Sequence, residues 1–267
     1  MLIYERLPDI LDTWGKYTPY ETQYCRFEPN IIGAGHKIID VYQTFCMARF
    51  SLASLDNNDY GQMVSKEENG KHSDINLNFI RSFLIQNSLM YYNNAIDISW
   101  QVLVMFCDET GLDLIYKEGQ YKKVSSCEFQ ELKDRLMYWE SCHTSESKTL
   151  RALHDHIDNF FNAPLTRQIR EKYNYIKHRG TFYFPGLGMN CKTLSFGFNG
   201  KTPLAIAKDE FNIEEWKEIL ISFDIAFVNY FQFIIDNIMP VNYLDTKIGL
   251  NEMFQYGIKI EKYLNEK

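Results

Sequence analysis

Apolar residues recur every three or four positions along most of this 267-residue chain, which is the spacing of helices that bury one face. Gly180 and Pro240 are expected to end helices, whereas Pro164 either breaks one helix or begins the next at its first turn. We predict helices over residues 36–55, 74–108, 125–141, 148–162, 164–178, 213–238 and 246–264, the third opened by a capping box at 125–128.

Two parts of the chain lack this helical spacing. Residues 1–35 contain three prolines and three glycines, and we expect an irregular N-terminal wrap in which Gly33–Ile38 forms a turn. Residues 181–207 combine short alternating patterns with turn residues, which predicts a small β-hairpin or meander. The predicted fold class is therefore mainly α. We expect one domain over residues 1–267, an antiparallel helical bundle with this β insertion.

The composition argues against a membrane-spanning protein, a secreted protein and a nonspecific nucleic-acid-binding protein. No apolar run reaches about 18 uninterrupted residues, and the N-terminus lacks the basic and apolar segments of a signal peptide. We therefore expect a cytoplasmic protein that does not cross a membrane. The formal net charge of −7 argues against nonspecific coating of nucleic acid, but it is compatible with a local basic site.

No metal or cofactor is expected. The six cysteines show neither paired nor regular spacing, as is typical of reduced thiols in a cytosol. A second group of metal-ligating residue types lies close together at His154, Asp155, His156 and Asp158. It has no identifiable third ligand and no supporting pattern around it, so we do not interpret it as a metal site.

The local basic site is predicted at the end of the helix over residues 164–178. Arg167, Arg170, Asn174 and His178 follow one another at steps of three, four and four residues, which places them within one quadrant of a helix. Arginine binds phosphate oxygens, and histidine can pass a proton near neutral pH, so this face suits a phosphate-containing ligand. The simpler alternative is a solvated basic face on which the histidine caps the helix.

A polar strip crosses the longest predicted helix, which covers residues 74–108. Asn87, Asn94, Asp97 and Gln101 line up on an otherwise apolar background. Buried amides and carboxylates need partners, so the strip either faces another polar surface or its members satisfy one another or the solvent.

The segment Tyr173–Gly180, YNYIKHRG, ends a helix that follows this long polar-striped helix, and it resembles the HEPN superfamily. The hallmark of that family is an Arg, often followed by Asn, and then a His at the end of one helix of an antiparallel bundle. Asn174 and His178 match the Asn and His of the motif, but Tyr173 stands where the family has Arg. Lys172 has an allowed spacing from the histidine, although it offers a point charge instead of a guanidinium fork.

The resemblance implies a metal-independent endoribonuclease of the toxin–antitoxin or phage-defence type. It further implies a homodimer, RNA or a nucleotide as the ligand, and an antitoxin-like protein as a further partner. His178 would be the general acid or base and Asn174 would orient it, with a polar residue of the earlier long helix, Asp97 or Asn94, hydrogen-bonded to the histidine. The phosphate would be contacted by basic residues of the same helix end, namely Arg167, Arg170, Lys177 and Arg179.

Two alternatives remain open because Tyr173 replaces the arginine of the motif. The first is a non-catalytic HEPN-like module that binds a nucleotide or a protein partner. The second is a purely structural helical dimer, in which Asn174 and His178 are hydrogen-bonded inside the bundle and inaccessible.

Overall fold

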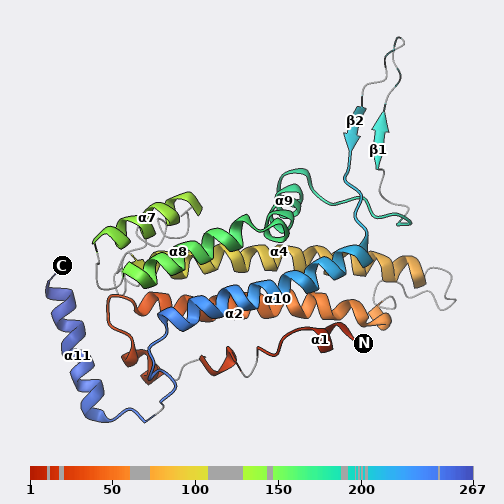
Figure 1. The fold of residues 1–267 in the computed structure, drawn as a ribbon. Helices are drawn as coiled ribbons and strands as arrows, with labels where there is room; N and C mark the ends of the chain where they lie inside the picture. The colour runs from red at the N-terminus through yellow and green to blue at the C-terminus, as the bar shows by residue number, and fades with distance from the viewer. Residues whose placement is uncertain are drawn as a thin grey trace. The chain divides into compact units, whose positions relative to one another are not determined.

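The computed structural model describes residues 1–10, 13–17, 21–60, 73–107, 129–142, 147–187, 192–195, 197, 199, 201, 204–245 and 247–266. This part of the chain is mainly helical, as predicted (Figure 1). The longer helices are α2 (Ile32–Ala53), α4 (Ser73–Cys107), α7 (Phe129–Cys142), α8 (Ser147–Asn162), α9 (Pro164–Arg179), α10 (Ile213–Ile238) and α11 (Leu250–Asn265). The shorter ones are α1 (Ile3–Arg6) and the 3-10 turns η1 (Gly15–Tyr17), η2 (Glu21–Arg26), η3 (Ser54–Asp56) and η4 (Asn58–Tyr60). The capping box expected at residues 125–128 lies outside the described residues.

Local chemistry explains where the helices around the candidate site begin and end. Pro164 is the first residue of α9, because its fixed φ suits a first helical turn. Gly180 follows the last residue with φ of 86°, and its N–H donates to the Ile176 carbonyl at 3.2 Å. Asn212 caps α10, since its Oδ1 accepts from the N–H groups of Glu214 and Glu215 at 3.0 and 3.2 Å.

The prediction of a turn at Gly33–Ile38 was wrong, because these residues lie in the first turns of α2. The physical reason is close packing. A Cβ at Gly35 would lie 2.3 Å from the ring of Phe27, which is buried against the helix. Glycine is therefore needed here for contact with an aromatic ring rather than for a change in chain direction.

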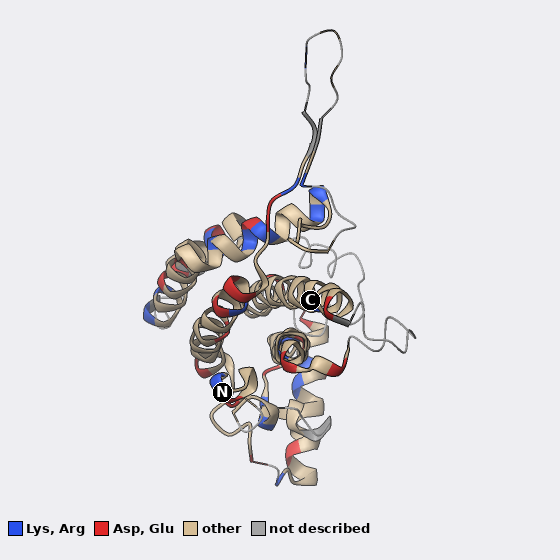
Figure 2. Cartoon of the chain, turned by 90° about the vertical axis from the view of Figure 1, so that its right-hand side faces the viewer, with Lys and Arg blue, Asp and Glu red and all other residues tan. Residues whose placement is uncertain are grey.

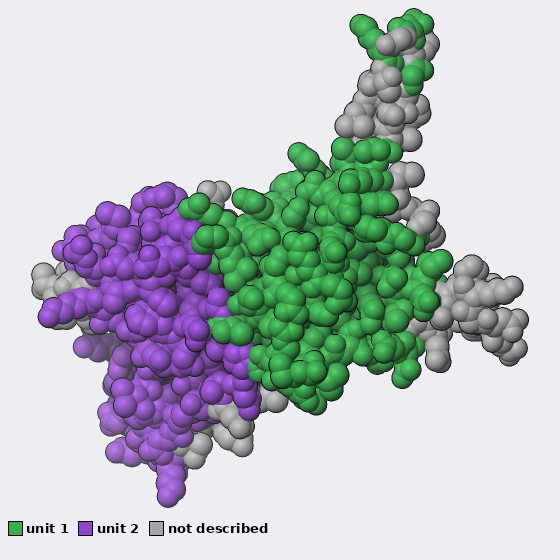
Figure 3. Space-filling view, turned by 45° about the vertical axis from the view of Figure 1, so that its right-hand side comes forward, with its two compact units in different colours: residues 1–7, 46–93, 164–225 green, residues 8–45, 94–163, 226–267 purple. Residues whose placement is uncertain are grey.

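The described chain divides into two compact units, coloured separately in Figure 3. Unit 1 consists of Met1–Leu7, Cys46–Asn93 and Pro164–Ile225, and unit 2 of Pro8–Phe45, Asn94–Ala163 and Ala226–Lys267. Helices α2, α4 and α10 each supply residues to both units.

A buried ion pair joins three helices of unit 1. Arg49 on α2 donates twice to the carboxylate of Asp224 on α10, from Nε at 2.7 Å and from Nη2 at 2.5 Å. The Tyr92 hydroxyl on α4 donates to the same carboxylate at 2.8 Å. Burial raises the pKa of Asp224, and the hydrogen bonds from Arg49 oppose this effect.

Helices α4 and α10 run in the same direction through unit 1. Arg81, near the start of α4, lines one pocket together with Ile213, the first residue of α10. Further along both helices, Tyr92 contacts Phe223 with ring centroids 5.4 Å apart. The two helices therefore bring their N-terminal ends to the same side of unit 1.

The core of unit 2 is aromatic. Phe160 on α8 stacks on Tyr230 of α10 with ring centroids 3.9 Å apart, and the Tyr230 hydroxyl lies 3.1 Å from the hydroxyl of Ser99 on α4. One turn earlier on α8, His156 contacts Phe233, which lies further along α10, at 4.2 Å between centroids. Helices α8 and α10 therefore run antiparallel in unit 2.

Two short strands lie within the range where a β insertion was expected. Strands β1 (Thr193–Ser195) and β2 (Leu204–Ala207) pair antiparallel, with Thr193 opposite Ala207 and an irregular register after Leu194. At their base, Tyr183 forms an isolated parallel bridge with Glu210. The chain thus leaves α9, forms this hairpin and returns to the start of α10.

Within the described chain, α10 has the length and apolar composition of a membrane span, although half of its most apolar stretch is buried in the structure. The core helix of a soluble protein meets the same criteria.

Candidate functional site

The predicted front of α9 is largely exposed. Arg167, Asn174 and His178 are all exposed, whereas Ile169 on the opposite side is buried. The amphipathic pattern of the sequence therefore matches the surface of the helix. Asn174 and His178 are therefore not hidden inside the bundle of this single chain, which is where the purely structural hypothesis expected them.

Arg170 differs from the rest of this front, because its guanidinium is directed at α4. Its Nη1 donates to Oδ1 of Asn93 at 3.2 Å, and the Asn93 side chain is fully buried. A charge-assisted hydrogen bond to a buried amide holds the arginine in place. Arg170 therefore anchors α9 to α4 within unit 1.

Asn93 is the polar residue of α4 that sequence analysis missed. The strip that we predicted contains Asn94 and Asp97, which belong to unit 2, whereas His178 belongs to unit 1. The pairing of His178 with either of them stays a prediction. The sequence did contain a signal for Asn93. Gln86 lies seven residues, or two helical turns, earlier on the same face of α4, and its side chain is buried as well.

The last turn of α9 carries positive charge that no described carboxylate neutralises. Lys177 and Arg179 are both exposed, and neither forms an ion pair within the described part of the chain. Lys172, by contrast, is bound to Asp209 at 2.9 Å. Figure 2 shows Lys and Arg residues on α9 and at the base of the β1–β2 hairpin.

A series of stacked rings, which we call the aromatic ladder, supports this end of α9. It runs from Tyr175 to Phe182, Phe211 and Trp216, with successive ring centroids 4.6, 4.6 and 4.8 Å apart. The backbone N–H of Asp209 donates to the Tyr175 hydroxyl at 2.9 Å. The ladder connects the last turn of α9 to the first turn of α10, so the position of the basic turn is set by packed rings rather than by a loop.

The candidate site combines one proton-transfer group with flanking cations. Asn174 lies one turn before His178 on the same stripe, so both side chains can contact one ligand group. Lys177 and Arg179 lie about 100° to either side of His178 around the helix. The guanidinium of Arg179 also lies over the Tyr175 ring, 5.8 Å from its centroid, which restricts that side chain. Tyr173, at the position of the motif arginine, is half-buried.

The residues once considered for a metal site have structural contacts. Asp158 accepts a hydrogen bond from Lys133, which lowers the pKa of that carboxyl, and Nε2 of His156 lies 3.1 Å from the Tyr230 carbonyl. Among the described residues, no group of three or more His, Cys, Asp or Glu side chains is close enough to hold a metal ion.

Comparison with known proteins gave no match to a family model, to a curated protein or to a solved structure.

Proposed function

We propose that this protein is a HEPN-like protein of the cytoplasm that binds RNA through the exposed end of α9. The observation that carries the proposal is the arrangement of His178 and Asn174 on one exposed stripe, flanked by Lys177 and Arg179, which have no described carboxylate partner. Exposed cations of this kind bind phosphate oxygens and release counterions, so they favour a nucleic-acid backbone.

Cleavage without a metal ion is the catalytic form of the proposal. The 2′-hydroxyl attacks the adjacent phosphorus, a base takes its proton, and an acid protonates the leaving 5′-oxygen, which yields a 2′,3′-cyclic phosphate and a 5′-hydroxyl. One protomer offers a single histidine at the site, whereas the step needs both a base and an acid. A homodimer would supply a second His178, and this is why we propose that two copies act together.

A binding module without catalysis is the second candidate. Two observations favour it: Tyr173 occupies the position of the motif arginine, and the nearest arginine on the same face, Arg170, is bound to Asn93. Such a module would use the same basic turn to hold RNA or a nucleotide, or to dock an antitoxin-like protein partner.

Fluorescence anisotropy with labelled single-stranded RNA tests the shared claim of both candidates. We expect salt-dependent binding by the native protein and weaker binding by the Lys177→Ala/Arg179→Ala variant. Loss of two phosphate contacts should make the plot of the logarithm of the association constant against the logarithm of the salt concentration less steep, by about 1.4 in slope. Lys259→Ala/Lys262→Ala is the matched control, because it also removes two exposed cations, both on α11 in the other unit. Equal loss of binding in the control, or no binding by the native protein, would contradict the proposal.

A further inference from the structure

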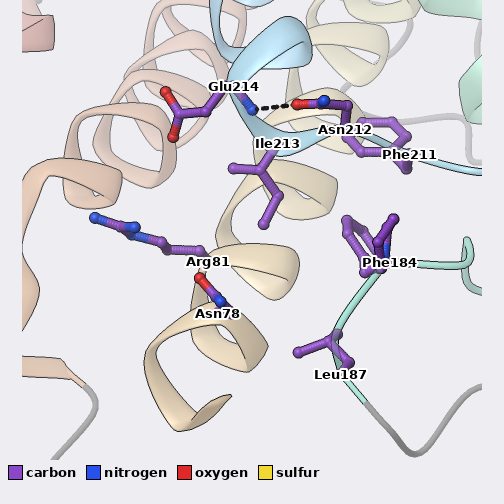
Figure 4. Close-up of a pocket in the computed structure, with 9 residues that line it drawn as sticks. Asn78, Arg81, Phe184, Leu187, Phe211, Asn212, Ile213 and Glu214 are labelled. Carbon is purple, nitrogen blue, oxygen red and sulfur yellow. Dashed lines mark hydrogen bonds between the residues drawn. The ribbon is translucent and has the colours of Figure 1, made fainter. Parts of the chain in front are cut away.

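A pocket of about 210 Å³ lies in unit 1 at the starts of α4 and α10 (Figure 4). Arg81 and Glu214 give its lining opposite charges, and the Arg81 guanidinium points away from the apolar side chains of Phe184 and Leu187. These groups do not converge on one ligand. A more extensive exposed surface, made of apolar side chains, lies on α11 in unit 2.

Helix α11 carries an exposed apolar stripe. Its large apolar residues with exposed side chains follow helical spacing, and Leu250 is 87% exposed and Phe254 is 67% exposed. The stripe consists of Leu250, Met253, Phe254, Ile258 and Leu264, with Gly257 at its centre. Side chains of this kind are normally covered, so the stripe is a candidate interface.

The opposite side of α11 already has its contacts. Tyr256 is the buried residue of this helix, and Glu252 pairs with Arg26 of η2 at 3.1 Å. Lys259 pairs with Glu28, which follows η2, at 2.6 Å. Tyr256, Glu252 and Lys259 fall within one quadrant of the helix, and the apolar stripe is centred on the other side. The contacts that hold α11 in unit 2 therefore leave the stripe open.

The size of the stripe suits a pair of identical helices. The exposed fractions of its side chains correspond to roughly 600 Å² of surface, which matches the largest apolar patch on an ordinary monomer. Two copies that cover this surface would together bury roughly 1,200 Å², the lower limit of a specific protein interface.

The charges of α11 favour a protein surface over a membrane surface. Helices that lie on membranes are rich in Lys and Arg along their polar face. Helix α11 carries two lysines and two glutamates, and both lysines are paired with carboxylates, Lys259 with Glu28 and Lys262 with Glu266. The helix therefore has no excess of positive charge for anionic lipids.

The order of residues along the stripe is nearly the same in both directions. Leu250 and Leu264 each lie seven residues from Gly257, and Phe254 and Ile260 each lie three residues from it. An antiparallel pair that crosses at Gly257 would place Leu250 against the partner's Leu264, and Phe254 against the partner's Ile260. Such a pair has the self-complementary surface that two-fold symmetry requires.

We propose that α11 pairs antiparallel with α11 of a second copy of this chain, with the two-fold axis at Gly257. This inference does not depend on the proposed RNA function, because the RNA site lies on α9 in unit 1 and α11 belongs to unit 2.

Sedimentation velocity of the full-length protein without RNA, at about 1 to about 100 µM, tests the proposal. We expect a monomer–dimer equilibrium with a dissociation constant in the micromolar range, as suits an interface of this small size. A monomer throughout this range of concentration would overturn the proposal.

Two variants with matched exposure locate the interface. Phe254→Glu should raise the dissociation constant of the dimer at least about 100-fold, because it places an unpaired charge in the apolar stripe. Phe50→Glu is the control and should form dimers like the native protein, since Phe50 is 70% exposed on α2 in unit 1. Native dimer affinity in Phe254→Glu, or an equal loss in both variants, would overturn the proposal.

Glu261 gives a test in the opposite direction. It is exposed and lies four residues after Gly257, opposite the partner's Met253 in the antiparallel pair. It is the charged residue of the stripe, so Glu261→Leu should lower the dissociation constant of the dimer about tenfold. A higher dissociation constant in this variant would contradict the arrangement.

Disulfide crosslinking determines the direction of the two helices. A mixture of the Leu250→Cys and Leu264→Cys variants should form crosslinked dimers on oxidation. Each variant alone should not exceed the background of the native protein, because its two new cysteines would lie about 20 Å apart. Crosslinking of either variant alone at the yield of the mixture would contradict the antiparallel arrangement.

Discussion

Replacing Asp224 with Asn tests how strongly the buried ion pair stabilises unit 1. Asparagine keeps the size of the side chain but removes its charge, so Arg49, whose side chain is only 13% exposed, loses the charge of the Asp224 carboxylate. Removal of one partner from a buried pair costs about 3–5 kcal/mol. Because Arg49 retains some contact with solvent, we expect a loss of about 3 kcal/mol in the free energy of unfolding.

The double variant Arg49→Met/Asp224→Leu separates the ion pair from its surroundings. It removes both charges together, and the Tyr92 hydroxyl loses the Asp224 carboxylate, which costs about 1–3 kcal/mol. The double variant should therefore be clearly more stable than the sum of the losses in the single variants Arg49→Met and Asp224→Leu predicts. Urea unfolding followed by circular dichroism measures the free energies of unfolding of the native protein, these two single variants and the double variant. A loss below about 1 kcal/mol for Asp224→Asn, or strict additivity in the double variant, would refute this account of the pair.

Three further predictions concern packing, pH and the aromatic ladder. Gly35→Ala should clash with Phe27, lower the free energy of unfolding by about 1–3 kcal/mol and so lower the urea midpoint. Gly257→Ala, whose added Cβ meets nothing within 4 Å, should raise the midpoint. The opposite order of the two midpoints would contradict the packing argument. Burial lowers the pKa of His156 below 6.5, so the unfolded chain takes up the proton first and stability should fall as pH drops below about 6.5. Melting temperatures between pH 7.5 and 5, compared with His156→Phe, should show a smaller pH dependence in the variant. Tyr175→Phe removes the acceptor of a backbone N–H and should cost about 1–3 kcal/mol in urea unfolding, and an unchanged midpoint would show that this bond does not hold α9.

Helix positions followed well from the sequence, because their apolar spacing and their end signals act locally. Helix α10 occupies the predicted residues 213–238, and α9 extends the predicted range by one residue. Helix α11 begins at Leu250 instead of 246. The Glu252 carboxylate accepts the N–H of Gly249 at 2.8 Å, which favours a start at this point.

Contacts between distant segments could not be predicted in the same way. The turn expected at Gly33–Ile38 was wrong because the local signal, two glycines, carries no information about the ring of Phe27. Tyr175 is buried although it lies on the flank of an exposed helix face, because the chain after Gly180 folds back and stacks Phe182 on it. The binding of Arg170 to Asn93 is likewise a tertiary contact.

In the candidate site, too, local features could be predicted from the sequence and contacts between distant segments could not. The exposure of Asn174 and His178 followed from the helical pattern, since both lie opposite the apolar face. The sequence could not show which cations of α9 lack a described carboxylate partner, because this depends on the fold. Lys172, for example, is paired with Asp209, which lies more than thirty residues away in the chain.

The most direct test of the proposed function is cleavage of single-stranded RNA by the purified protein in excess EDTA. The catalytic form of the proposal predicts products with 2′,3′-cyclic phosphate and 5′-hydroxyl ends, and a loss of about 100-fold or more in rate for His178→Ala, the range of one acid or base. His154→Ala, a histidine of unit 2, is the control and should cleave at the native rate. RNA binding without cleavage would select the non-catalytic module. Cleavage at the same rate in His178→Ala would contradict the assignment of the site.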